Sequence, residues 1–245
     1  SIGYTDSFKE FSQVKYSHLW GWLRSLALAI EWLLTAMNGL LGHWGWSIVV
    51  LSLVMKLLLM PVSLLTLKFQ RNVSKFQTLL APRLEEIKQK YKGEKAHNEM
   101  MAAHKKLGIT PFYSLKPLFL NFIQIPILVA IFNVLGEMSP LENESFLWVT
   151  DLSLPDALVH ANFAVPLLGS SLNMLPFIMT FITLFSTVYY KNDLAPDTET
   201  KKQKINLYLM AFGFFVLFYP FPAAMVLYWA LANLWQLVLQ KMTGN

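Results

Sequence analysis

Apolar residues dominate five stretches of the chain, and each is long enough to form a membrane-spanning helix. The stretches cover residues 46–67, 117–136, 163–190, 205–220 and 222–240. A span needs about 20 mostly apolar residues, because a helix rises about 1.5 Å per residue across the bilayer core. Tyr219-Pro220-Phe221-Pro222 separates the last two stretches and predicts a tight turn. Pro166 and Pro176 interrupt the third stretch, which predicts that this span can be shorter than its hydropathy indicates.

A sixth apolar stretch, residues 19–41, has the pattern of an amphipathic helix. Its apolar positions step by helical spacing: Leu19, Trp22, Leu23, Leu26, Ile30, Leu33, Leu34, Met37 and Leu40. The opposite face carries Arg24, Glu31, Thr35 and Asn38. With Trp20, Trp22 and Trp44 near its ends, this pattern favours a helix lying in the membrane interface, and a sixth span is the alternative. We therefore expect an external segment (1–18), an interfacial helix (19–43) and a five-span core (44–241).

The first stretch carries a lysine near its middle, within VLSLVMKLLLMP (50–61). A charge at the centre of a membrane helix costs about 2.5–3.5 kcal/mol on insertion scales. On a helical wheel Gly45, Ser52, Lys56 and Ser63 fall within about 20° of one line, so the lysine belongs to a polar stripe. The other spans add Asn121 and Gln124, then Asn173, Thr180 and Thr187, then Trp229, Asn233, Gln236 and Gln240.

These polar stripes have two interpretations. Interhelical hydrogen bonds, worth about 0.6 kcal/mol each, explain single Asn, Gln and Thr side chains. Lys56 is less easily explained in this way, because intramembrane charges usually mark a substrate path. Apart from Glu137 at a border, the spans contain no acid to pair with it. The sequence therefore predicts a hydrated cavity lined by Lys56 and the other stripes.

A charged segment between the first two spans, residues 68–110, predicts a cytoplasmic helical hairpin. Its apolar positions step by three or four: Val73, Phe76, Leu80, Leu84, Ile87 and Tyr91. Lys92-Gly93 interrupts this pattern before a second helix-competent segment, 94–107. The hairpin is either a solvated structural element or a basic platform for anionic headgroups, RNA or a client chain. The candidate contact residues are Arg71, Lys75, Arg83, Met100 and Met101.

Composition and charge support a membrane protein and set its orientation. Of 245 residues, 55% are hydrophobic and 14% charged, against about 45–50% and about 25% in soluble domains. Residues 68–116 hold eleven Lys or Arg, whereas the loop 137–162 holds five acids and no Lys or Arg. The positive-inside rule places the first segment in the cytoplasm and the acidic loop outside. Five spans then predict a cytoplasmic C-terminus and an outer N-terminus, which needs an export signal or an earlier span.

The sequence argues against an enzyme. The absence of cysteine excludes disulfides, iron–sulfur clusters and thiol catalysis. The five histidines lack zinc-ligand spacing, and there is no Walker loop, G-x-S-x-G or H-E-x-x-H motif. We expect no catalytic residue, metal or cofactor.

Five motifs in order resemble the YidC membrane-protein insertases and their mitochondrial and chloroplast relatives. Lys56 precedes Pro61 by five residues, Gly45-Trp46-Ser47-Ile48 opens the first span, and Ile123-Gln124-Ile125-Pro126-Ile127 lies in the second. Phe146-Leu147-Trp148-Val149-Thr150-Asp151-Leu152-Ser153 is similar to F-L-W-x-x-D-L-S. Residues 221–229, FPAAMVLYW, are similar to F-P-x-G-L-x-L-Y-Y/W. The resemblance covers residues 19–241.

The resemblance implies a positively charged groove that is open to the cytoplasm and to lipid. Lys56 matches the family's groove cation, which is usually arginine, Gln124 belongs to the groove, and Tyr228 and Trp229 lie near the client-contact helix. The full set of candidate groove residues is Lys56, Ser52, Ser63, Asn121, Gln124, Asn173, Thr180, Tyr228, Trp229, Asn233 and Gln236. Thr110-Pro111-Phe112-Tyr113-Ser114 departs from the family's N-P-x-G-G-type turn.

The sequence thus predicts an all-α membrane protein of five transmembrane helices, with an interfacial helix and a cytoplasmic hairpin. The expected function is a membrane-protein insertase and chaperone in the bacterial plasma (inner) membrane. Its expected partners are nascent membrane proteins, membrane lipids, the Sec translocon and the ribosome, with no sequence-specific nucleic acid. The alternatives are a small-anion transporter or channel, for which no inverted repeat is found, and a non-catalytic assembly subunit of a membrane complex.

Overall fold

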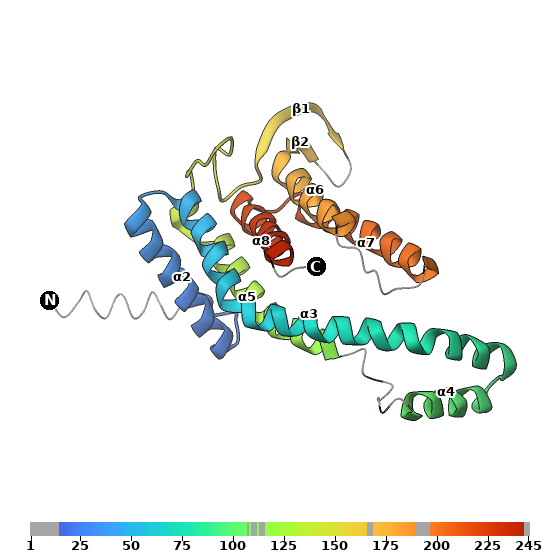
Figure 1. Ribbon diagram of the computed structural model, residues 1–245. Coiled ribbons are helices and arrows are strands. Elements are labelled where there is room, and N and C mark those ends of the chain that lie inside the picture. Colours follow the sequence, from blue (N-terminus) through green and yellow to red (C-terminus); the bar gives the residue numbers. More distant parts are fainter. Residues whose placement is uncertain are drawn as a thin grey trace. The chain divides into compact units, whose positions relative to one another are not determined.

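Helices dominate the computed structural model, which describes residues 15–106, 108, 112, 116–165, 169–189 and 197–242. The helices are α2 (Gly21–Leu41), α3 (Trp44–Lys90), α4 (Glu94–Lys106), α5 (Lys116–Glu137), α6 (Met174–Tyr189), α7 (Asp197–Phe218) and α8 (Ala223–Met242) (Figure 1). Between α5 and α6 lie a 3-10 turn, η2 (Ser139–Leu141), and two strands, β1 (Ala157–Val165) and β2 (Gly169–Asn173). The prediction of a mostly helical chain is therefore confirmed.

The chain forms two compact units, which are described separately. The first contains Ser1–Leu57, Ile125–Ser186 and Met210–Asn245, and the second contains Leu58–Gln124 and Thr187–Leu209. Helix α3 is continuous through the sequence boundary between them and runs on through Pro61 and Pro82. The first predicted span and the first arm of the predicted hairpin thus form one 47-residue helix, without a break near residue 67.

The third predicted span is wrong in its first part. Strands β1 (Ala157–Val165) and β2 (Gly169–Asn173) pair antiparallel, with Ala157 opposite Asn173, Val165 opposite Gly169 and an irregular register between these ends. Helix α6 begins only at Met174. The strands pair their backbone groups with each other, and this pairing cannot be read from the hydropathy of the sequence. Pro166, named in the sequence argument, lies outside the described residues.

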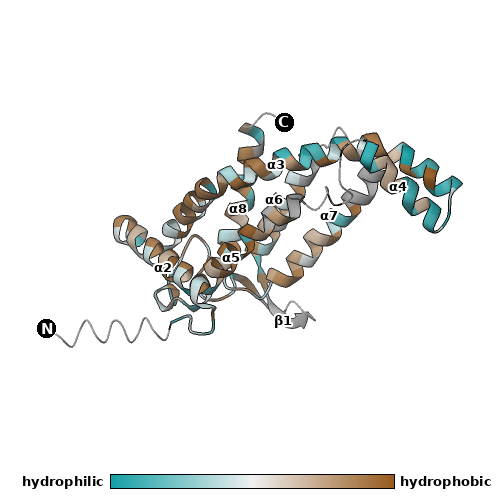
Figure 2. Cartoon of the chain, turned by 90° about the horizontal axis from the view of Figure 1, so that it is seen from below, coloured by the Kyte–Doolittle hydropathy of each residue, from teal (hydrophilic) through white to brown (hydrophobic). Residues whose placement is uncertain are grey.

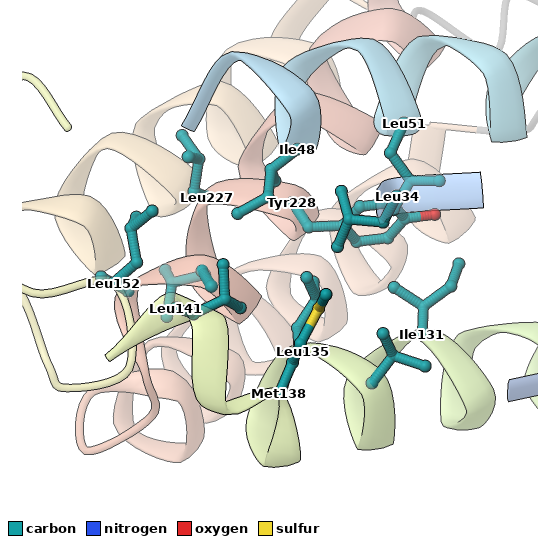
Figure 3. Close-up of a cluster of buried hydrophobic side chains, with 14 of the residues drawn as sticks. Leu34, Ile48, Leu51, Ile131, Leu135, Met138, Leu141, Leu152, Leu227 and Tyr228 are labelled. Carbon is teal, nitrogen blue, oxygen red and sulfur yellow. The ribbon is translucent and has the colours of Figure 1, made fainter. Parts of the chain in front are cut away.

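The core of the first unit lies between α2, the start of α3, α5 and α8. Leu34, Ile48, Leu51, Ile131 and Leu135 are all at most 1% exposed. Figure 3 shows these side chains converging with Leu227 and Tyr228 from α8. Because buried apolar side chains are the main stabilising term in folding, this cluster fixes α3 against α8.

The turn before α2 is attached to that helix by side-chain contacts. Lys15 forms an ion pair with Glu31, and the Nε of Arg24 donates to the carbonyl of Lys15 over 3.0 Å. Tyr16 is 3% exposed, and its burial, followed by the nearby Glu31 charge, raises its pKa above the ordinary value. The predicted polar face of α2 is thus partly covered by the preceding turn. Trp22 and Leu40, predicted on its apolar face, are instead exposed.

The loop between α5 and α6 caps the first turn of α8. The backbone N–H groups of Ala223 and Ala224, at the start of α8, donate to the carbonyls of Leu154 and Leu152 over 2.8 and 2.9 Å. The first N–H groups of a helix have no partner within the helix, so these bonds satisfy them. The loop motif around Trp148–Ser153 is therefore tied directly to the helix that carries the last polar stripe.

Among the described residues one helical segment, Trp44–Phe76, is long and apolar enough to cross a membrane. Shorter apolar segments are Phe122–Glu137, Met174–Ser186, Tyr208–Phe218 and Ala223–Leu239. Figure 2 shows these helices coloured mainly as hydrophobic, in contrast to the hydrophilic α4. Large apolar side chains such as Leu58, Phe181 and Phe212 are more than 60% exposed, as lipid-facing positions would be.

The second unit contains a helical hairpin with a small core of its own. Helix α3 ends at Lys90, Gly93 adopts a left-handed conformation with φ of 63°, and α4 begins at Glu94. The break lies where the sequence predicts it. Leu80 and Ile87 of α3 are buried together with Ala96 and Ala103 of α4. Small alanines on α4 allow the two helices to pack closely.

Gly45 provides the first testable prediction. A Cβ at this position would lie 2.0 Å from Cδ2 of Phe146, whereas a Cβ at Gly39 on α2 would meet nothing within 4 Å. Gly45→Ala should therefore lower the free energy of unfolding by about 1–3 kcal/mol through overpacking. Gly39→Ala should raise it by up to about 1 kcal/mol through helix propensity. Denaturant unfolding in detergent compares the two, and equal effects would contradict the close contact.

Candidate functional site: the polar contacts of Lys56

Lys56 lies on the inward-facing side of α3. It stands about 18 Å along the helix axis from Trp44, at about 1.5 Å per residue. Its stripe neighbours Ser52 and Ser63 are 1% and 7% exposed, and Gly45 is also buried. The predicted stripe therefore faces the protein interior. Ser52 and Lys56 belong to the first unit, whereas Ser63 belongs to the second.

Lys56 contacts α8 through an amide. Its ammonium donates a hydrogen bond to Oε1 of Gln236. None of the ion pairs between described residues involves Lys56. The lysine is half-buried and its partner is neutral, so its positive charge is not compensated by a carboxylate in the described part of the chain. This leaves the site suited to a visiting negative group.

A second contact between the same helices involves Trp235, which the sequence argument missed. Its indole Nε1 donates to Oγ of Ser52 over 3.0 Å, while Ser52 donates to the carbonyl of Val49 over 2.7 Å. Trp235 lies about 100° around α8 from Gln236, outside the predicted polar face. A tryptophan in an apolar helix gives no separate signal of this role. A buried indole N–H usually finds a hydrogen-bond acceptor, and this general preference is the only sequence-level indication of the contact.

Polar residues of α6 and α8 meet next to this site. Asn233 donates to Oγ1 of Thr183 over 3.5 Å, and Thr183 donates to the carbonyl of Met179. Thr180 donates to the carbonyl of Pro176, so its hydroxyl is used within α6. Asn233 thus contacts α6 through Thr183, a residue that is not among the predicted stripe residues. The side chains of Thr187 and Gln240 lie outside the described parts of the chain.

Asn173 does not belong to the helix face on which the sequence placed it. It ends strand β2, is 2% exposed, and donates from Nδ2 to the carbonyl of Tyr219 over 2.7 Å. Its bonds tie the β-hairpin to the end of α7. The seven-residue spacing to Thr180 is therefore coincidental, because α6 begins one residue after Asn173.

Asp156, counted in the sequence only as an outer-loop charge, is a buried cap. Its side chain is 4% exposed and Oδ2 accepts three hydrogen bonds. The donors are Nε1 of Trp148 at 3.0 Å and the backbone N–H groups of Met174 and Leu175 at 2.9 and 2.7 Å. A carboxylate at a helix N-terminus satisfies unpaired donors and interacts favourably with the helix dipole. Asp156 therefore fixes the start of α6.

The two aromatic candidates of α8 pack in apolar surroundings. Tyr228 is 5% exposed within the main core (Figure 3). Trp229 lies 5.3 Å from Phe218 and 5.8 Å from both Phe132 and Phe214, between ring centroids. No hydrogen bond between described residues joins either of them to Lys56. The structure thus gives both a packing role, and their place near a client stays a prediction.

The remaining predicted residues lie in the second unit. Gln124 is half-buried, and the side chain of Asn121 lies outside the described set. Arg71, Lys75 and Arg83 are exposed, and Arg83 lies 3.7 Å from Glu86. Met100 packs against the hairpin core, while Met101 is 43% exposed. Groups of acids and histidines able to hold a metal are absent from the described residues.

The site in the first unit is thus a short polar row between α3 and α8, continued to α6. It contains Lys56, Gln236, Ser52, Trp235, Asn233 and Thr183. It has one cation, neutral hydrogen-bonding groups and an apolar surround. Chemically it can hold an anion or a polar segment, and its residues offer no nucleophile paired with a base.

A family model and similar proteins of known name point to the same family. The family model described as "60Kd inner membrane protein" matches residues 36–245. Relatives named "Membrane protein insertase YidC" include one from Janthinobacterium sp. (strain Marseille), 34% identical over 220 residues. Another, from Chlorobium limicola (strain DSM 245 / NBRC 103803 / 6330), is 30% identical over 226 residues.

A solved structure is similar as well. The crystal structure of an active YidC insertase, with its first transmembrane domain resolved, matches with a TM-score of 0.56 and 25% identity. The match covers 89% of this chain and 46% of that chain. The two curated relatives are covered to 36% and 37% of their length. The chain thus spans about a third of the curated relatives that it matches.

Proposed function

The chain belongs to the 60Kd inner membrane protein family, and from this we propose that it is a membrane-protein insertase and chaperone. In this proposal it receives segments of nascent membrane proteins in a hydrated, positively charged groove of the inner leaflet. It then releases them into the bilayer. The relatives that carry the name insertase support the activity.

One observation carries the proposed mechanism: Lys56 is half-buried in an apolar helix and its partner is an amide. An intramembrane cation is costly, so its presence without a carboxylate favours a functional over a structural role. A client's acidic tail supplies the missing negative charge while the tail crosses the membrane. The Ser52–Trp235 contact holds the two helices that present the lysine.

The driving force in this mechanism comes from the client. Water near Lys56 shortens the apolar barrier that a polar tail must cross. The client's hydrophobic helix then moves into lipid, which is favourable at about 25 cal/mol per Å² of apolar surface. No nucleotide is needed, and the chain shows no nucleotide-binding motif.

The proposed topology has five spans with a cytoplasmic C-terminus. The spans are the apolar parts of α3, α5, α6, α7 and α8. Lysines near the α6–α7 connection and Lys241 of α8 fit the cytoplasmic side, and the acidic loop before β1 fits the outer side. Helix α2, with exposed Trp22 and Trp32 and with exposed Trp20 directly before it, fits the membrane interface.

The α3–α4 hairpin is proposed as a site of client capture on the cytoplasmic side. Its exposed basic residues Arg71, Lys75 and Arg83 suit acidic segments or anionic headgroups. Exposed Met101 adds an adaptable apolar contact. Nascent membrane proteins and lipids are the proposed partners, and the Sec translocon and the ribosome are further ones in the cell.

Crosslinking from position 56 tests the function. A photoreactive residue there, in the full chain in membranes, should label the tail or apolar helix of a stalled nascent membrane protein. A matched probe at exposed Thr35, on the polar face of α2, should not label the client. Labelling at position 56 of one constant membrane partner, with no client, would instead favour an assembly subunit and contradict the insertase function.

A further inference from the structure

The contact between Lys56 and α8 points to a role for Gln236 that the family assignment does not contain. We propose that the Gln236 amide is a placeholder: it accepts the hydrogen bond of the Lys56 ammonium until a client carboxylate displaces it and takes over this bond. Gln236 is then a specificity-determining residue for acidic clients. The inference rests on the proposed function, because it concerns how the same site accepts its substrate.

The chemistry of the pair supports this role. The amide Oε1 accepts a hydrogen bond from the ammonium without neutralising its charge. A carboxylate forms a charge-assisted bond that is about twice as strong as a neutral one. A client Asp or Glu therefore outcompetes the amide, whereas a client Asn or Gln gains little over it. The amide orients the lysine, and a client group replaces it only if that group binds the ammonium more strongly than the amide does.

The position of Gln236 does not depend on Lys56. Its neighbour Trp235 is bonded to Ser52 on α3, and Asn233 is bonded to Thr183 on α6. The buried residues Leu227 and Tyr228 hold the preceding turns of α8 in the core. Displacing the amide from the ammonium therefore breaks one side-chain contact while α8 keeps its other bonds to α3 and α6. Such an exchange suits a site that must bind and release repeatedly.

Gln236→Glu tests the proposal in the full chain reconstituted in proteoliposomes. Two clients are compared that differ only by one Asp or Asn in the translocated tail. The fixed carboxylate should pair with Lys56 and lower insertion of the Asp client by about tenfold. Insertion of the Asn client should change less than about twofold, so the Asp-to-Asn ratio falls. Gln236→Leu removes the placeholder and should keep or raise that ratio.

Controls separate this role from a structural one. Asn206→Asp makes the same amide-to-carboxylate change at an exposed position of α7 and should leave both clients unaffected. Trp235→Phe removes the other α3–α8 hydrogen bond and should lower insertion of the Asp client and of the Asn client by the same factor. If Gln236→Glu leaves the Asp-to-Asn insertion ratio unchanged, including by lowering insertion of both clients equally, the placeholder role is overturned. A ratio near one in the unsubstituted protein, unchanged by Lys56→Ala, overturns the proposed reception of acidic tails itself.

Discussion

Lys56→Ala is expected to reduce insertion of a client with an acidic translocated tail by at least about tenfold, while Lys56→Arg retains most of it. Alanine leaves the acidic group without a partner in an apolar surround, whereas arginine restores the charge. The amide of Gln236 remains in both variants but loses its donor only in Lys56→Ala. Protease protection of the client in proteoliposomes measures the effect.

The comparison needs a control for folding, because Lys56 is half-buried. The midpoint of thermal unfolding in detergent should change little in Lys56→Ala, since removing a buried cation also removes its desolvation cost. A client whose tail has no acid should insert in Lys56→Ala nearly as in the unsubstituted protein. Normal insertion of the acidic client by a stably folded Lys56→Ala protein would rule out the role of this charge.

Asp156→Ala is expected to lower the free energy of unfolding by about 3 kcal/mol. The substitution leaves the indole N–H of Trp148 and two backbone N–H groups of α6 without their shared acceptor. Because the site is 4% exposed, water cannot fully replace the carboxylate. Circular dichroism during denaturant unfolding in detergent measures the loss.

Two further variants make this prediction specific. Asp156→Asn keeps one acceptor oxygen and should lose less stability than Asp156→Ala. Glu142→Ala changes an exposed acid of the same loop and should lie within about 0.5 kcal/mol of the unsubstituted protein. Equal losses for Asp156→Ala and Glu142→Ala would show that Asp156 does not cap α6.

The sequence predicted those features of the fold that depend on local periodicity. The inward stripe of Gly45, Ser52 and Lys56 follows from α-helix geometry, and the structure buries Gly45 and Ser52 and half-buries Lys56. The hairpin break at Lys92-Gly93 follows from glycine and the loss of the apolar pattern. In both cases the feature is set by residues within a few helical turns, so it can be predicted without knowing which other segments pack against that helix.

The third span shows where periodicity fails. Residues 163–172 are mainly apolar or small, and hydropathy by itself does not distinguish a helix from a paired strand. Strand β2 is decided by its partner β1 and by Asn173, which bonds to Tyr219 far along the chain. The Asn173–Tyr219 bond joins residues 46 positions apart, so it is a tertiary interaction that leaves no local pattern in the sequence.

The sequence by itself therefore determined the class of the protein, its apolar helices, the basic hairpin and the position of an uncompensated lysine. Only the tertiary structure decided that Lys56 meets Gln236, that Trp235 bonds Ser52 and that Asp156 caps α6. The physical reason is that a helix face is set by local geometry. Its partner is set by which faces bury most apolar surface together and by which polar groups each pairing satisfies.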